Sequence, residues 1–113
     1  MRKNEYRVDV SNPAENDLMD IVRYISSNLE APITALKMME TIEVALAGLS
    51  TMPHSRPKVR DERLAAMGYH IEIIKNYIAF FTINEKEKVV DVERILYGRR
   101  DWKRILLPHD LPH

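Results

Sequence analysis

A chain of 113 residues with 45% hydrophobic residues and no net charge is long enough for one domain with a hydrophobic core. It contains no cysteine, which excludes disulfides, thiol nucleophiles and thiolate metal sites and suits a reducing cytoplasm. No apolar stretch reaches the length of a membrane span, and no export signal opens the sequence. We therefore expect a cytoplasmic protein with one domain over residues 1–107 and a flexible tail over 108–113.

The zero net charge conceals an uneven distribution along the chain. Residues 1–53 hold five Lys or Arg against eight Asp or Glu, whereas residues 54–113 hold twelve against nine. The second half is therefore where an anionic partner is expected to dock. A domain that coats nucleic acid without specificity is usually far more basic, so the charge pattern alone does not indicate such a role.

The first half of the chain predicts a strand followed by two helices. Residues 6–10 alternate like a half-buried strand, and Asn12-Pro13 then ends the strand and starts a helix with Asn12 as its N-cap. Apolar residues recur at three- and four-residue steps in two stretches, 14–29 and 35–49. Two such helices with a short connection are expected to form an antiparallel hairpin.

After the second helix the sequence predicts a basic segment, three strands and a short helix. Residues 54–67 carry four cationic residues with little periodicity and are expected to form an exposed basic loop. A short closing helix is expected from Asp101, with Trp102 packing it onto the sheet. Between these segments lie three β-type runs with hairpin-sized gaps, at residues 69–74, 77–83 and 89–96.

This order of elements predicts an α+β fold with the sequence β-α-α-β-β-β-α. We expect a helical hairpin packed on a twisted, mainly antiparallel four-stranded sheet, with the other sheet face partly free to bind. At the end of the last strand, Gly98 permits a sharp corner that spreads Tyr97, Arg99 and Arg100 around it.

Several segments, taken in order, resemble the RelE/ParE superfamily of bacterial toxins, the stable halves of type II toxin–antitoxin pairs. They are the strand that ends in Asn12-Pro13-Ala14, the helical hairpin, the loop Ser55-Arg56-Pro57, the hairpin over 76–81 and the run Arg94-Ile95-Leu96-Tyr97-Gly98-Arg99-Arg100-Asp101. The resemblance covers nearly the whole chain. It implies growth inhibition, a role in plasmid stabilization, a cognate antitoxin protein bound in a hetero-oligomer, and no cofactor.

The superfamily contains two chemistries, and the resemblance leaves both open. RelE-like members cut messenger RNA on the ribosome with clustered basic residues, whereas ParE-like members inhibit DNA gyrase and have no known catalytic set. This sequence has Tyr69 and Ile71 where RelE has lysines, and Ile78 where RelE has an arginine, while Arg100 plainly matches. Because these losses remove transition-state cations, the sequence favours inhibition by binding. A third alternative is a degenerate toxin that only binds its antitoxin.

Two sets of candidate site residues follow from these alternatives. Metal-free RNA cleavage needs a base, a proton donor for the leaving oxygen and positive charge at the phosphate. For a ribonuclease the candidates are Arg63, His70, Arg94, Tyr97 and Arg100. For a target-binding surface the candidates are Arg56, Lys58, Arg60, Arg99 and Arg100.

The histidines are interpreted more conservatively. His70 and Glu72 lie two residues apart on one strand, a pattern more typical of a solvated sheet face than of catalysis. The four histidines show no metal-ligand spacing with carboxylates, so no metal site is expected.

Overall fold

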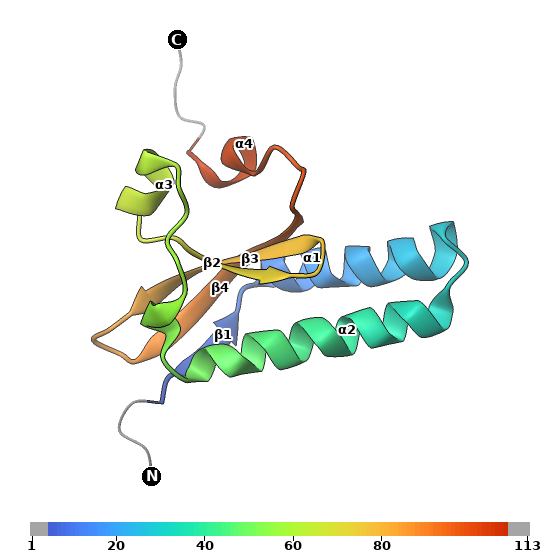
Figure 1. Ribbon diagram of the computed structural model, residues 1–113, viewed down its shortest axis with the longest axis horizontal. Coiled ribbons are helices and arrows are strands. Elements are labelled where there is room, and N and C mark those ends of the chain that lie inside the picture. The colour runs from blue at the N-terminus through green and yellow to red at the C-terminus, as the bar shows by residue number, and fades with distance from the viewer. Residues whose placement is uncertain (1–4, 109–113) are drawn as a thin grey trace.

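The described part of the chain, residues 5–108 of a computed structural model, contains four strands and four α-helices (Figure 1). The predicted tail lies, from residue 109 onward, outside the described residues. Within residues 5–108, no helix is long and apolar enough to cross a membrane. The elements in order are β1 (Arg7–Val10), α1 (Asn12–Arg23), the π-helical turn η1 (Tyr24–Asn28), α2 (Pro32–Ala47), the 3₁₀ turns η2 (Gly48–Ser50) and η3 (Pro53–Ser55), α3 (Glu62–Ala66), β2 (His70–Ile74), β3 (Tyr77–Asn84), β4 (Val89–Tyr97) and α4 (Trp102–Leu106).

The strands form one mixed sheet in the order β1-β4-β3-β2. β1 runs parallel to β4, and the other two pairs are antiparallel. The hairpin of α1 and α2 lies on one side of this sheet, and α3 and α4 lie on the other (Figure 1). The predicted α+β fold and its helical hairpin are confirmed.

Two hydrophobic cores sandwich the sheet, and neighbouring residues of β3 contribute one to each. Phe81 packs in the core beneath the hairpin, whereas Phe80 packs with Leu64 and Leu106 in the core beneath α3 and α4. Both phenylalanines are completely buried, since successive strand residues face opposite sides and both sides are covered. Trp102 lies 5.4 Å from Phe80 between ring centroids, so its predicted packing of the closing helix onto the sheet is confirmed.

The expectation of an exposed loop over residues 54–67 is correct only in part: most of these residues are exposed, but the segment is not a plain loop. Val59 and Leu64 anchor this segment in the core beneath it, and residues 62–66 form α3. The Asp61 side chain caps α3 by accepting a hydrogen bond from the backbone nitrogen of Leu64 at 3.1 Å. The free part of this sheet face is therefore smaller than expected and lies near Ile73, which is 67% exposed.

The start of α1 is also one residue earlier than predicted. Ser11, rather than Asn12, is the N-cap, and its hydroxyl accepts a hydrogen bond from the backbone nitrogen of Ala14 at 3.0 Å. The same hydroxyl donates to the carbonyl of Glu93 at 2.8 Å, and the Ser11 backbone nitrogen donates to Val92. Ser11 is preferred because it caps the helix and extends the pairing of β1 with β4.

Asp17, six residues after Ser11, makes a second contact between α1 and β4. β1 pairs only with Val89–Val92, which leaves the second half of β4 without a neighbouring strand on that side. The Asp17 carboxylate accepts the backbone N–H of Ile95 at 2.9 Å and two hydrogen bonds from Arg94, at 2.7 and 2.8 Å. Asp17 is only 7% exposed, so a buried carboxylate takes the place of the missing strand.

We predict that Asp17→Ala destabilises the protein by about 2–3 kcal/mol in urea unfolding. It leaves the Ile95 N–H and the Arg94 guanidinium without their acceptor, although the Arg94 side chain is 27% exposed and water recovers part of the loss. The matched control is Asp20→Ala on the same helix, because Asp20 pairs with Arg23 at the surface and its loss is expected to cost less than about 0.5 kcal/mol. Equal costs for the two variants would contradict the role of Asp17.

Candidate functional site

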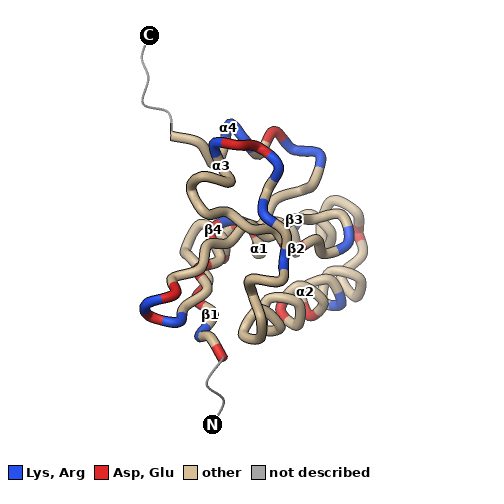
Figure 2. The backbone as a smooth tube through the Cα atoms, turned by 60° about the vertical axis from the view of Figure 1, so that its left-hand side comes forward, with Lys and Arg blue, Asp and Glu red and all other residues tan. Residues whose placement is uncertain are grey.

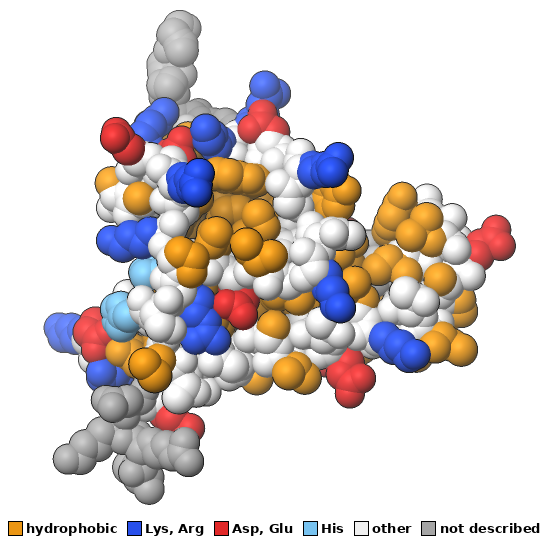
Figure 3. All heavy atoms as spheres, viewed as in Figure 1, with side chains coloured by type: hydrophobic (Ala, Val, Ile, Leu, Met, Phe, Trp, Pro, Cys, Tyr) orange, Lys and Arg blue, Asp and Glu red, His pale blue; other side chains and the backbone are white. Residues whose placement is uncertain are grey.

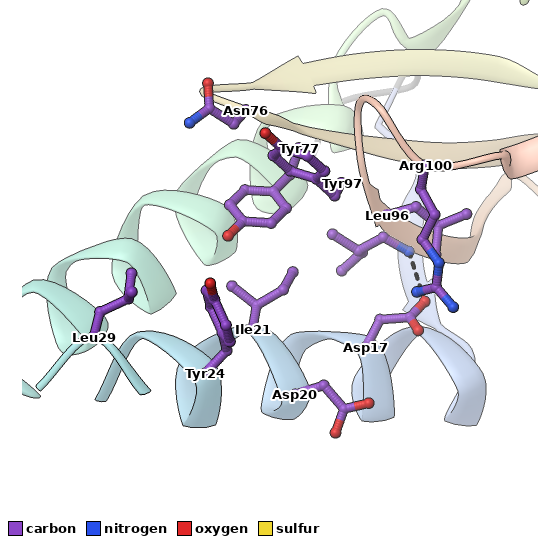
Figure 4. Close-up of a pocket in the computed structure, with 11 residues that line it drawn as sticks. Asp17, Asp20, Ile21, Tyr24, Leu29, Asn76, Tyr77, Leu96, Tyr97 and Arg100 are labelled. Carbon is purple, nitrogen blue, oxygen red and sulfur yellow. Dashed lines mark hydrogen bonds between the residues drawn. The ribbon is translucent and has the colours of Figure 1, made fainter. Parts of the chain in front are cut away.

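A groove of about 510 Å³ opens between the helical hairpin and the end of the sheet that carries Tyr77 and Tyr97 (Figure 4). Ile21 and Tyr24 form its helical wall, and Leu29 closes its far end. We call this cavity the tyrosine groove. It exists because Tyr77 begins β3 and Tyr97 ends β4, so antiparallel pairing places the two side by side.

Three tyrosines give the groove its chemical character. The rings of Tyr77 and Tyr97 meet edge to face with centroids 6.0 Å apart, and Tyr24 faces them from the hairpin (Figure 4). Tyr24 and Tyr97 are about half exposed, and burial raises the pKa of the Tyr77 hydroxyl above its ordinary value. Such rings offer apolar area together with a hydroxyl donor, which suits an amphipathic ligand.

The opposite end of the groove is polar. Arg100 reaches it from the corner after β4, and Asp17 reaches it from α1 (Figure 4). Arg100 is exposed, and among the described ion pairs none uses its guanidinium. Of the predicted site residues, Tyr97 and Arg100 are therefore the two that share this groove.

Lys and Arg positions gather along the backbone at and between α3 and α4 (Figure 2). An ion pair of 3.5 Å between Lys103 of α4 and Asp61 at the start of α3 holds the two segments together. We call this surface the basic end. Its exposed cations are Arg60, Arg63, Arg99, Arg100, Lys103 and Arg104.

The five residues predicted for a ribonuclease do not form one cluster. His70 pairs with Phe81 of β3, whereas Tyr97 pairs with Tyr77, which lies four residues before Phe81 at the start of β3. Four residues of strand span about 13 Å, and β3 itself separates the strands that carry His70 and Tyr97. Arg63 lies on α3 at the basic end, and the two hydrogen bonds from Arg94 to Asp17 raise the pKa of Arg94 and occupy its guanidinium.

The interpretation of His70 and Glu72 as solvated is wrong for His70, which is 7% exposed. The segment after η3 pairs with the start of β2, since Ile71 donates its backbone N–H to Pro57. His70 also stacks on Phe81 with ring centroids 5.4 Å apart. Glu72 accepts a hydrogen bond of 3.0 Å from Arg56, and both side chains are about one quarter exposed.

The residues predicted for target binding divide between two regions. Arg60, Arg99 and Arg100 belong to the basic end. Arg56 and Lys58 instead line a second, open cavity with His54, Ser55 and His70, which we call the histidine pocket. Their role in binding stays a prediction.

Exposed apolar side chains mark a further surface on the hairpin. Ile33, Leu36 and Val44 of α2 are each more than 60% exposed. Figure 3 shows apolar side chains gathered at the tip of the hairpin and over the sheet. Neither these residues nor Tyr24 and Tyr77 could be identified from the sequence as part of a surface, because apolar and aromatic residues in helices and strands usually belong to the core.

No group of three or more His, Cys, Asp or Glu in residues 5–108 lies close enough to hold a metal ion.

Comparison with known proteins gives three results. The sequence profile of the ParE toxin of the type II toxin–antitoxin system parDE matches residues 8–102. A chain from the chromosomal ParDE system of P. aeruginosa is 18% identical with a TM-score of 0.70, and the match covers 84% of this chain and 98% of that one. A chain from the toxin–antitoxin complex RelBE2 of Mycobacterium tuberculosis is 18% identical with a TM-score of 0.58, covering 85% and 94%. No curated protein sequence matches.

Beside the histidine pocket, the Glu85 carboxylate collects three hydrogen bonds. Lys88 donates at 2.6 Å, Tyr6 donates at 2.8 Å, and Nε2 of His54 lies at 2.7 Å. These bonds, that of Lys88 first, lower the pKa of Glu85 from 4.5 to about 2. Because folding lowers this pKa, the bonds stabilise the fold above about pH 4.5, and this contribution is lost as the pH falls towards 2.

We predict that a carboxyl-detected NMR titration finds the pKa of Glu85 near 2 and that Lys88→Met raises it towards the ordinary 4.5. The control is Lys86→Met in the same turn, because Lys86 is not among the donors to Glu85. An ordinary pKa for Glu85 in the unsubstituted protein would show that the three donors do not hold the carboxylate in solution.

Proposed function

The chain belongs to the ParE toxin family of type II toxin–antitoxin systems, and from this we propose that it inhibits bacterial growth by binding DNA gyrase. The observation that supports binding over ribosome-dependent cleavage is the separation of the candidate catalytic residues. Arg94 is held by Asp17, and His70 lies far along the sheet from Tyr97. Catalysis of phosphoryl transfer requires such groups to converge on one phosphate.

The basic end is the surface that we propose for the target. Its guanidinium and ammonium groups are exposed, and exposed charges steer a partner and fix its orientation more than they add affinity. Arg100 belongs both to this surface and to the tyrosine groove, so a target side chain held by Arg100 would have apolar contacts within reach.

The alternative is a ribosome-dependent mRNA endonuclease with a variant basic site. The observation in its favour is again the basic end, because exposed Lys and Arg also suit the phosphates of RNA. In both versions the protein acts in the cytoplasm, and plasmid stabilization is the biological role that we propose.

The partner that we propose is a cognate antitoxin bound to the helical hairpin. Ile33, Leu36 and Val44 lie on one exposed face of α2, which we call the apolar stripe, and the exposed Glu40 lies between Leu36 and Val44 on that face. Leu29 of the tyrosine groove lies one helical turn before Ile33 in the sequence. A disordered segment that folds into an amphipathic helix would bury this surface. The resulting complex would be a toxin–antitoxin hetero-oligomer.

We predict that the purified protein blocks supercoiling by gyrase and leaves mRNA intact in ribosomes programmed at the A site. Reversing two charges at the basic end, Arg60→Glu with Arg100→Glu, should relieve gyrase inhibition at least tenfold. It should change the stability by less than about 0.5 kcal/mol per site, because both side chains are exposed.

The matched control for this pair is Arg7→Glu with Lys86→Glu, which makes the same charge change at exposed positions of β1 and of the turn between β3 and β4. The control should retain full inhibition. Cut mRNA with unaffected gyrase would promote the endonuclease, and the absence of both activities would leave a degenerate toxin.

We predict that Ile33→Asp weakens binding of the co-expressed antitoxin at least tenfold, since it places a charge in the apolar stripe. Thr34→Asp is the control, because it adds the same charge to the next exposed position in the same helical turn. Surface plasmon resonance compares the two variants. Equal affinities would place the antitoxin elsewhere.

A further inference from the structure

The three rings of the tyrosine groove come from three different elements. Tyr24 begins η1, Tyr77 begins β3 and Tyr97 ends β4. Tyr24 takes part in none of the ring contacts described for residues 5–108, and it faces the other two rings across the groove (Figure 4). Burial raises the pKa of Tyr77, and the nearby hydroxyls of Tyr97 and Tyr24 add to the rise. The groove is therefore open between aromatic walls, an arrangement that suits a flat ring.

A π-helical turn places Tyr24 and Leu29 in the same wall. In an α-helix, residues five apart point about 140° away from each other, because each turn has about 3.6 residues. Here the backbone nitrogen of Leu29 donates to the carbonyl of Tyr24 at 3.2 Å, which stacks the two residues one above the other. Both side chains line the groove as a result. Single π-helical turns frequently lie at functional sites.

The corner after β4 holds Arg100 at the polar end of the groove. The backbone nitrogen of Gly98 donates to the carbonyl of Asn76 at 2.8 Å, and the backbone nitrogen of Arg100 donates to the carbonyl of Tyr97 at 2.9 Å. A Cβ atom at position 98 would lie 3.3 Å from the same Asn76 oxygen, so glycine allows the corner to pack this closely on the turn between β2 and β3. The backbone of Arg100 is thereby fixed beside the aromatic pair.

The charges of the groove leave one cation unmatched. Asp17, Asp20 and Arg100 are the charged residues that line it. Arg94 neutralises Asp17 through hydrogen bonds of 2.7 and 2.8 Å, and Arg23 pairs with Asp20 at 3.0 Å. Among the ion pairs described for residues 5–108, none uses Arg100. Its guanidinium is therefore available to an anionic ligand.

This unmatched guanidinium favours a carboxylate, which it can bind through two parallel hydrogen bonds. A phosphate with two negative charges is less suitable, because one cation neutralises only half of its charge and the carboxylates of Asp17 and Asp20 repel it. The volume of about 510 Å³ lies within the range of small-molecule sites, roughly 300–1,000 Å³. The ligand is thus defined by one ring for the aromatic walls and one carboxylate for Arg100.

From this arrangement we propose that the tyrosine groove binds a small aromatic carboxylic acid. Its ring lies between Tyr24 and the pair of Tyr77 and Tyr97, with the end away from the carboxylate towards Leu29. Its carboxylate is bound by Arg100. The proposal goes beyond gyrase inhibition and does not rest on it, although Arg100 also belongs to the basic end. A protein that binds the acid without inhibiting gyrase would contradict the proposed function alone.

The test titrates phenylacetate into the full chain with carbon-13-labelled tyrosine rings and follows the ring signals by NMR. Saturable shifts are expected for Tyr24, Tyr77 and Tyr97. Tyr6 and Tyr69 lie outside the groove and serve as internal controls without such shifts. Phenylacetamide, which lacks the charge, should bind about tenfold more weakly or worse. Phenyl phosphate, which carries two charges, should also bind more weakly than phenylacetate.

Two variants connect binding to the assigned side chains. Arg100→Gln should weaken phenylacetate binding about tenfold or more, because it removes the charge-assisted hydrogen bonds. Tyr24→Leu should weaken it severalfold, because one aromatic wall is lost. Arg100 is exposed and Tyr24 is half exposed, so both variants are expected to fold. The matched control is Lys75→Gln, which removes an exposed cation next to Asn76 that does not line the groove and should retain full affinity.

Three results would each overturn the proposal: no saturable shifts of the groove tyrosines, equal affinities for phenylacetate and phenylacetamide, or unchanged affinity of Arg100→Gln. Tighter binding of phenyl phosphate than of phenylacetate would overturn the assignment of a carboxylate to the site.

Discussion

The attachment of Asp17 to the free edge of β4 is the interaction on which the rest of the structure depends. β1 is only four residues long, so it cannot satisfy the whole edge of a nine-residue strand. A buried N–H without a partner is costly, and Asp17 removes that cost at Ile95. Ile21 and Tyr24 follow at helical spacing on the same face, so the bond that satisfies the edge also places the wall of the tyrosine groove.

The same bond limits the chemistry of the site. A buried carboxylate needs a cation, and Arg94 supplies it through two hydrogen bonds. An arginine that neutralises Asp17 is not available to a phosphate, although its position beside Tyr97 made it a reasonable catalytic candidate. In this chain Arg94 therefore stabilises the fold rather than a ligand.

The sequence predicted the elements that are long enough to show a repeating pattern of apolar residues. The strands at 70–74, 77–84 and 89–97 lie within one residue of their expected bounds, because alternation reports burial directly. Both hairpin helices are where periodicity placed them, although α1 gives way to a π-helical turn at Tyr24 and α2 begins three residues earlier than expected, at Pro32. α3 has five residues, too few to show a period, and Ser11 became the cap only through contacts with β4. Neither Asp17 nor His54 could be identified from the sequence, because Ile95 and His70, the residues they contact, are brought to them by tertiary folding.

α2 runs from the tyrosine groove towards the histidine pocket, so a single partner could contact both cavities. α2 begins close to Leu29 at the tyrosine groove and leads through η2 to η3, which carries His54 in the histidine pocket. Its sixteen residues span about 24 Å. One amphipathic segment laid along the exposed stripe would thus reach from one cavity to the other. Apart from Arg100, which also lines the tyrosine groove, the basic end lies around α3 and α4 on the other side of the sheet. A partner that covers α2 alone would therefore leave most of these cations open.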